Sequence, residues 1–204
     1  RHTAWTGATR ANGFTAYGDT DGPLDGTSFE RSTTRFNNDV TITKNLTASF
    51  DLFFKRSMGK NPNIDPMYNT LISAPVYAAK WSDGRVAEGK TGANIWGMTF
   101  LGGYNNGWYN QVGGKMSLDY SPLDGLKLSA VVAPTLGFDK VKNFRLRVPY
   151  YAADDPTLYA GVLEGCTQTD LYETRNDNYR VTAQLLANYT KSFGSHNLNA
   201  MAGY

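Results

Sequence analysis

The sequence predicts an all-β protein built mainly as one antiparallel, up-and-down sheet. Apolar and polar residues alternate with a period of two along most of the chain, and no convincing helical period is present. The 204 residues are 41% hydrophobic and include 13 Tyr, 10 Phe and 4 Trp, so the chain is rich in aromatic side chains. Only 19% of the residues are charged, and a net charge of +2 does not favour a nucleic-acid surface.

Each predicted strand is a stretch of alternation bounded by turn residues. The seven strands span 13–18, which is the weakest, 36–42, 46–55, 108–120, 126–138, 179–189 and 198–204. On the apolar face of the six clear strands there is no Asp, Glu, Lys or Arg. The opposite faces are polar and carry charged residues, among them Asp51, Lys55, Lys115, Asp119 and Arg180.

Strand length and aromatic placement favour a transmembrane β-barrel over a soluble sheet. The strands are about 9–13 residues long, close to what a tilted strand needs to cross a bilayer and longer than the usual soluble strand. Tyr120 and Tyr189 lie beside short turns. Aromatic residues at the other strand ends fit a second interfacial girdle, to which we assign Phe54, Trp108, Tyr109, Phe138 and Tyr179.

The lengths of the connections alternate as they do in outer-membrane barrels. Short turns are predicted at 44–45, 121–125 and 191–197, long connections at 56–107 and 139–177, and an intermediate one at 18–32. Outer-membrane barrels place short turns on the periplasmic side and long loops outside the cell. We therefore expect the apolar faces to point to lipid and the polar faces to point to a wet interior. The alternative that remains open is a soluble, secreted β-sandwich that binds glycans, because its strands alternate too.

The closing stretch "NYRVTAQLLANYTKSFGSHNLNAMAGY" resembles a barrel hairpin of the SusC-like TonB-dependent transporters of the Bacteroidetes outer membrane. In that family a strand ends in a pattern like "NYxKxFGxHN" and the next begins like "LxAxAGY". The segments "FERSTTRFNNDVTITKNLTASFDLFFKRS" and "APVYAAKWSDGR" resemble an upstream hairpin and the extracellular loop that follows it. The resemblance spans most of the chain, and the last hairpin is its most specific part.

This resemblance implies a 22-stranded barrel with a plugged lumen, in the outer membrane, of which these strands form a part. It also implies TonB-energised import of oligosaccharides, glycans or peptides, with a SusD-like surface lipoprotein and the TonB complex as partners. Residues 1–204 would belong to the barrel domain, without the plug domain or the TonB box. The chain starts with Arg-His and ends within a strand pattern, so we expect a piece of a longer polypeptide.

Nothing in the sequence predicts catalysis, a metal site or a cofactor. His2 and His196 are the only histidines, and no metal-binding or nucleotide-binding motif is present. Cys166 fits an ordinary loop thiol better than a nucleophile. The cluster of Asp19, Asp21 and Asp25 has the composition of a calcium loop, but its spacing favours a solvated turn.

Aromatic and polar residues in the first long connection are candidates for contacts with a substrate or a partner, since long loops often carry function. These residues are Tyr77, Trp81, Asp83, Arg85, Trp96 and Tyr104. The competing interpretation is that they pack the loop against itself or the barrel rim. The five charged residues of the polar faces could contact a substrate, but mixed charge is expected in any wet barrel interior.

Overall fold

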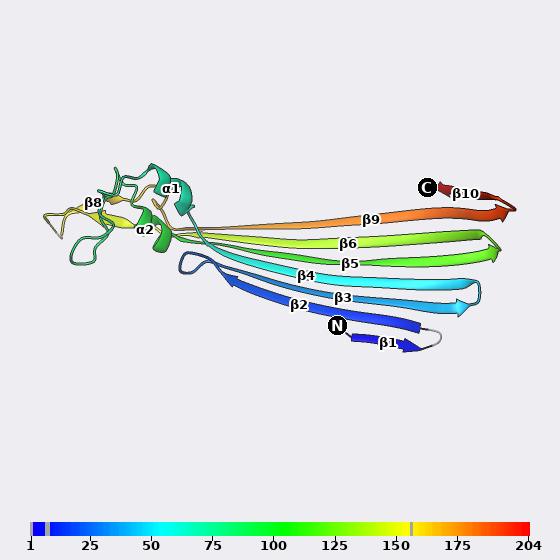
Figure 1. The fold of residues 1–204 in the computed structure, drawn as a ribbon. Coiled ribbons are helices and arrows are strands. Elements are labelled where there is room, and N and C mark those ends of the chain that lie inside the picture. The colour runs from blue at the N-terminus through cyan, green and yellow to red at the C-terminus, as the bar shows by residue number, and fades with distance from the viewer. Residues whose placement is uncertain (1, 7–8, 156) are drawn as a thin grey trace.

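The computed structural model describes residues 2–6, 9–155 and 157–204, and its main feature is one long antiparallel sheet (Figure 1). In this part of the chain the sheet has eight strands in the order β1-β2-β3-β4-β5-β6-β9-β10. Neighbours in the sheet therefore follow one another along the chain, apart from one excursion between β6 and β9. The strands are β1 (His2–Thr6), β2 (Thr9–Asp21), β3 (Ser28–Thr43), β4 (Leu46–Pro62), β5 (Gly103–Leu123), β6 (Leu126–Arg145), β9 (Asp170–Phe193) and β10 (His196–Gly203).

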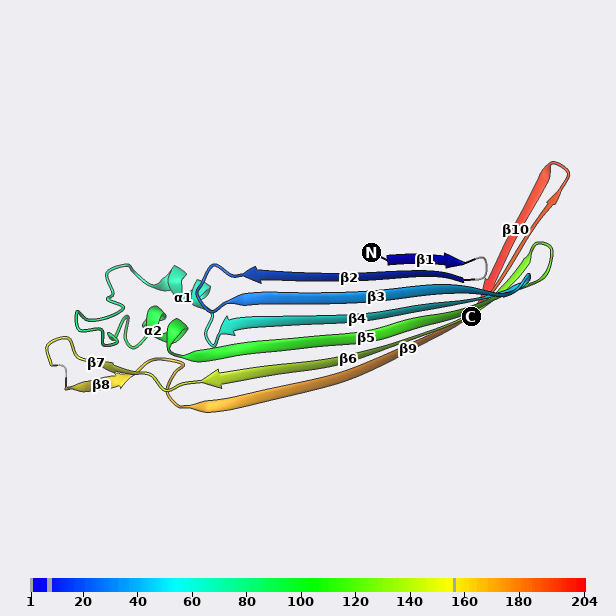
Figure 2. The ribbon, with the colours of Figure 1, turned by 90° about the horizontal axis from the view of Figure 1, so that it is seen from below.

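Both long connections leave the same end of the sheet (Figures 1 and 2). The connection between β4 and β5 holds the short helices α1 (Pro66–Ile72) and α2 (Ile95–Phe100). The connection between β6 and β9 holds a small hairpin of β7 (Pro149–Tyr151) and β8 (Tyr159–Val162). The opposite end carries the tight turns after β3, β5 and β9. The predicted separation of long loops from short turns is confirmed.

All seven predicted strands are present, but most are longer than predicted. β5 has 21 residues and β9 has 24, because pairing continues where both faces are polar and hydrophobic alternation gives no signal. Tyr104, predicted to lie in a loop, therefore belongs to β5, where it pairs with Pro62 and Phe144.

β1, the β7–β8 hairpin and the two helices were not predicted. Each helix is too short to show a helical period. Local capping starts them instead: Asp65 accepts a hydrogen bond from Met67 N–H before α1, and Asn94 accepts one from Gly97 N–H before α2.

The register gathers the apolar residues of neighbouring strands on one face. Phe50 lies opposite Met116, Leu118 opposite Ala130, and Ala130 opposite Leu185. A sandwich core would bury these side chains, yet Phe50 is 36% exposed and Leu185 is 61% exposed. The buried hydrophobic cluster instead lies among the long connections, around Met98, Val148, Leu163 and Cys166. No helix among the described residues is long and apolar enough to cross a membrane.

The uncharged apolar band ends where the register brings aromatic residues together. Phe54 and Tyr179 lie in one cross-strand row with Val112 and Leu136, and Phe138 lies in the next row. Trp108 lies one row further out, and Lys140 Nζ is 5.8 Å from its ring centroid.

Tyr109 does not belong to this girdle. It pairs with Ser57 and Asp139 on the opposite, polar face, because consecutive residues of a strand point to opposite faces. The assignment of Tyr109 to the aromatic girdle is therefore wrong.

Gly113 in β5 offers a test of how tightly the strands pack. A methyl group at Gly113 would lie 2.5 Å from Cε1 of Phe53 and 3.1 Å from the carbonyl oxygen of Pro134. We expect Gly113→Ala to lower the free energy of unfolding by about 1–2 kcal/mol through overpacking. The measurement is the urea midpoint of the chain in detergent, followed by tryptophan emission.

Gly18→Ala in β2 is the matched control, because nothing lies within 4 Å of the added methyl. This variant should match or slightly exceed the parent in stability. Equal midpoints for the two variants would contradict close packing of Phe53 over Gly113.

Candidate functional site

The two long connections form a single packed unit, which we call the loop cap (residues 63–102, 146–155 and 157–169). Leu163 and Cys166 are fully buried there, against Met98 and Val148. Backbone hydrogen bonds join the two connections, from Glu164 N–H to Gly92 O and from Leu146 N–H to Gly102 O. Burial raises the pKa of the Cys166 thiol, which disfavours the thiolate and agrees with an inert loop cysteine.

Asn94 is the polar centre of the loop cap and is 3% exposed. Its side-chain amide donates to the carbonyl oxygens of Ala79 at 2.6 Å and Ala87 at 2.7 Å. Its side-chain oxygen accepts from Gly97 N–H at 3.1 Å and caps α2. One side chain therefore bonds to three backbone groups, two in the segment between α1 and α2 and one in α2, and sequence alone did not single it out.

Trp81 and Arg85 tie the first connection to the second. The Trp81 indole N–H donates to Tyr151 O at 2.8 Å, and Arg85 Nη1 donates to Ala152 O at 3.2 Å. Asp83 accepts from the backbone N–H of Arg85 and pairs with its guanidinium, and these contacts hold the pKa of Asp83 below its usual value. For these three candidates the contacts fit the packing interpretation.

Tyr77 and Trp96 line a groove between α1, residues 73–79 and α2, with a volume of about 350 Å³. Phe100 also lines the groove. The exposed fraction is 44% for Phe100 and 43% for Tyr77. Lys80 Nζ lies 3.8 Å from the centroid of the Trp96 ring. Thr99 lines the same groove with a buried hydroxyl that has no hydrogen-bond partner among the described residues. The volume of the groove is at the lower end of the range for small-molecule sites.

The groove can hold a flat or ring-shaped group against aromatic faces. Tyr77 and Trp96 were among the sequence candidates, whereas Phe100 and Thr99 were missed because nothing in their spacing marks a ligand site. Tyr104 is outside the groove; it packs against Phe144 with ring centroids 5.4 Å apart.

All five charged candidates of the strands lie on the same, polar face. Asp51 of β4 is opposite Lys115 of β5, and Arg35 Nε lies 3.5 Å from its carboxylate. Asp119 accepts from Ser129 Oγ at 2.5 Å and lies 3.1 Å from Lys127 Nζ. The strands thus balance opposite charges across neighbouring positions.

Two hollows mark this polar face. The larger, about 440 Å³, is lined by Asp51, Lys115 and Asp119 together with polar residues of β2 and β3. Lys55 lines the second, about 240 Å³, nearer the loop cap. Arg180 of β9 lies opposite Thr135 and outside both. The structure therefore divides the five residues among separate positions rather than gathering them into one site.

No group of three or more His, Cys, Asp or Glu side chains in the described ranges is arranged to hold a metal ion. Asp19 and Asp21 end β2, and Asp25 lies in the turn that follows. The side chain of His2 lies outside the described part, and His196 opens β10.

The chain matches no protein-family model and no curated protein.

Asn94 provides a test of the loop cap. Asn94→Ala removes the donor to the buried carbonyl oxygen of Ala87, leaves that of Ala79 with only the Ala87 N–H at 3.3 Å, and removes the cap of α2. We therefore expect the free energy of opening of the loop cap to fall by roughly 2–4 kcal/mol. Local opening should then expose Cys166, the only cysteine, and speed its alkylation by iodoacetamide by at least about tenfold.

Asn69→Ala is the matched control, because the Asn69 amide makes one exposed bond, to Asp65 O at 3.0 Å. Its alkylation rate should stay at the parent level. Slow alkylation in Asn94→Ala would mean that the cap holds together without this side chain.

Proposed function

We propose that this chain is a wall segment of an outer-membrane β-barrel that imports nutrients and is energised through TonB. The observation that carries the proposal is the exposed, uncharged band of apolar residues across β3–β6, β9 and β10. Phe50, Leu128 and Leu185 lie in this band and are 36%, 39% and 61% exposed. An apolar face of this size is not stable in water and needs an apolar partner or medium to cover it. The hydrocarbon core of a bilayer is such a medium, and it suits a face that carries no charged side chain.

The dimensions of the band support a membrane. From Leu46 to Phe54 and from Leu128 to Leu136 the band runs roughly 27 Å along the strands. With the usual barrel tilt this becomes about 21 Å, near the apolar height of outer-membrane barrels. Beyond the band the same face becomes charged, with Lys142 opposite Glu173, so strands that continue outward enter water.

The opposite face supports a wet interior. Asp51 and Asp119 both have cationic partners on neighbouring strands, and the face is hollowed between β2 and β5. A sheet with one lipid face and one charged face is the wall of a water-containing barrel. The loop cap then lies outside the cell, where long loops of such barrels are found.

The transport role, the partners and the cargo follow from the resemblance to SusC-like transporters. In this proposal the barrel imports oligosaccharides, glycans or peptides, a SusD-like lipoprotein covers the loop side, and the TonB complex acts through a plug region. The groove around Tyr77, Trp96 and Phe100 is the described surface best suited to touch such cargo, because aromatic faces stack on rings.

A pair of neighbouring substitutions tests the membrane assignment. Leu185 and Gln184 are consecutive in β9 and therefore point to opposite faces. We expect the wild-type chain to float with phospholipid vesicles after an alkaline wash. Leu185→Arg should weaken insertion by about 1–3 kcal/mol, because the cost of an arginine falls from the bilayer midplane toward the interface and Leu185 lies between the two.

Gln184→Arg should float like the wild type, because it adds a cation to the wet face. If the wild-type chain stays in the soluble fraction without detergent, the membrane proposal is wrong. If the two arginine variants behave alike, the assignment of the faces is wrong.

Substitutions in the groove test the cargo contact. Wild-type chain in detergent is screened against oligosaccharides and peptides. We expect Tyr77→Ala and Phe100→Ala each to weaken the best ligand about tenfold through lost stacking. Tyr68→Ala, an exposed tyrosine of α1 outside the groove, should leave the affinity unchanged. Equal losses in all three variants would place the contact elsewhere in the loop cap.

A further inference from the structure

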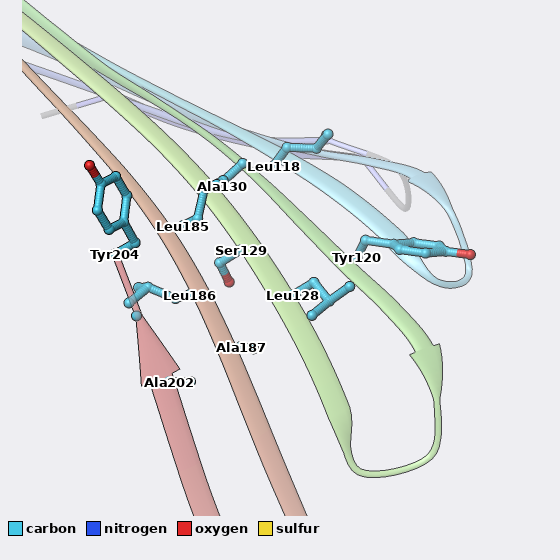
Figure 3. A pocket seen from close by; sticks show the side chains of 11 residues that line it. Leu118, Tyr120, Leu128, Ser129, Ala130, Leu185, Leu186, Ala187, Ala202 and Tyr204 are labelled. Atoms are coloured by element: carbon cyan, nitrogen blue, oxygen red, sulfur yellow. The ribbon is translucent and has the colours of Figure 1, made fainter.

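A further hollow lies on the apolar face, near the tight turns and far from the loop cap (Figure 3). Its volume is about 550 Å³, and its lining is almost entirely apolar. The lining residues come from four strands and are Leu118 and Tyr120 of β5, Leu128, Ser129 and Ala130 of β6, Leu185, Leu186 and Ala187 of β9, and Ala202, Gly203 and Tyr204 at the end of the chain. We call this hollow the outer groove.

The register explains why the face is hollowed at this place. One cross-strand row runs Leu118, Ala130, Leu185 and Tyr204, and the next runs Tyr120, Leu128, Ala187 and Ala202. Small alanines therefore lie beside large side chains in both rows, which leaves a depression with walls of leucine and tyrosine. The β9–β10 hairpin also bends away from the line of the longer strands (Figure 2).

A cation lies on the same face just beyond the outer groove. Two residues past Tyr189, Lys191 of β9 is opposite Leu198, and its Nζ lies 5.5 Å from the Phe193 ring. Since residues i and i+4 of a strand share a face, Lys191 is about 13 Å along the strand from Ala187. An apolar groove, a tyrosine and then a lysine follow the order of acyl chain, interface and phosphate in a lipid leaflet.

We propose that the outer groove binds one acyl chain of a bilayer phospholipid, whose phosphate pairs with Lys191. This inference rests on the proposed membrane location, because a lipid reaches the groove only from a bilayer. The position of Lys191 favours a lipid over a second copy of the chain, since this cation lies beyond the turn-side end of the groove, where the anionic headgroup of the lipid would be. Alanines at the floor let the acyl chain approach the sheet closely.

The test measures phospholipid retained by the whole chain. The chain is inserted into vesicles of phosphatidylethanolamine and phosphatidylglycerol, extracted into mild detergent and weighed by native mass spectrometry. We expect one retained phosphatidylglycerol on the wild type. Ala187→Phe and Ala130→Phe fill the outer groove and should lower retention about tenfold.

Two controls separate the groove from the rest of the face. Ala183→Phe adds the same ring on the same face of β9 outside the lining and should retain lipid like the wild type. Lys191→Gln should lower retention of phosphatidylglycerol severalfold, whereas Lys44→Gln, in the turn before β4, should not.

The outcomes also separate this inference from the proposed function. If the wild type floats with vesicles but Ala187→Phe and Ala130→Phe retain as much lipid as it does, the outer groove is not a lipid site and the membrane proposal stands. If the wild type has the mass of a dimer without lipid, and Ala187→Phe abolishes this dimer, the groove binds a second copy of the chain and the lipid proposal is wrong. Failure of the wild type to float would end both proposals.

Discussion

A single pleated sheet has two faces, and each face must meet a medium that suits its side chains. The register puts Phe50, Leu118 and Leu185 on one side and Asp51, Asp119 and Arg180 on the other across neighbouring strands. Backbone hydrogen bonds between strands satisfy the amide groups of both faces together, so the side chains alone decide what each face tolerates. One face carries no charged side chain over the whole width of the band, so only the other face is suited to contact with water.

The loop cap satisfies a different requirement, because two long connections must be ordered without a large core. The described buried cluster is small, and Asn94 supplies three hydrogen bonds at its centre. Trp81 and Arg85 use backbone carbonyls of the other connection as acceptors, which ties segments about seventy residues apart. A cap held by a few buried contacts is rigid where those contacts lie and still leaves Tyr77 and Phe100 half-exposed at the groove.

The strands could be predicted from sequence because their alternation is strong where one face is apolar and the other polar. The same signal vanished beyond Phe54 and Trp108, where both faces are wet, and this is why β5 and β9 extend further than predicted and why Tyr104 was placed in a loop. The charged face could be predicted residue by residue, whereas the groove could not. Phe100 and Thr99 reach it through the packing of α2 against a distant segment, which no local pattern encodes.

The edges of the sheet decide what the membrane proposal requires of its surroundings. β10 and Tyr204 cover the outer edge of β9 from Leu185 to Phe193, and within the described residues no strand covers Tyr179 to Gln184. The backbone of those residues lies at the level of the apolar band, where an unpaired amide or carbonyl costs several kcal/mol in hydrocarbon. A single sheet of this kind inserts only at that cost along its open edge, and closure into a barrel removes the cost. The proposal requires a further strand beside β9, with apolar residues in register with Tyr179, Val181 and Ala183. It also requires pairing for the part of β2 beyond Gly13, where β1 ends, so that the polar face becomes the inside of a closed wall.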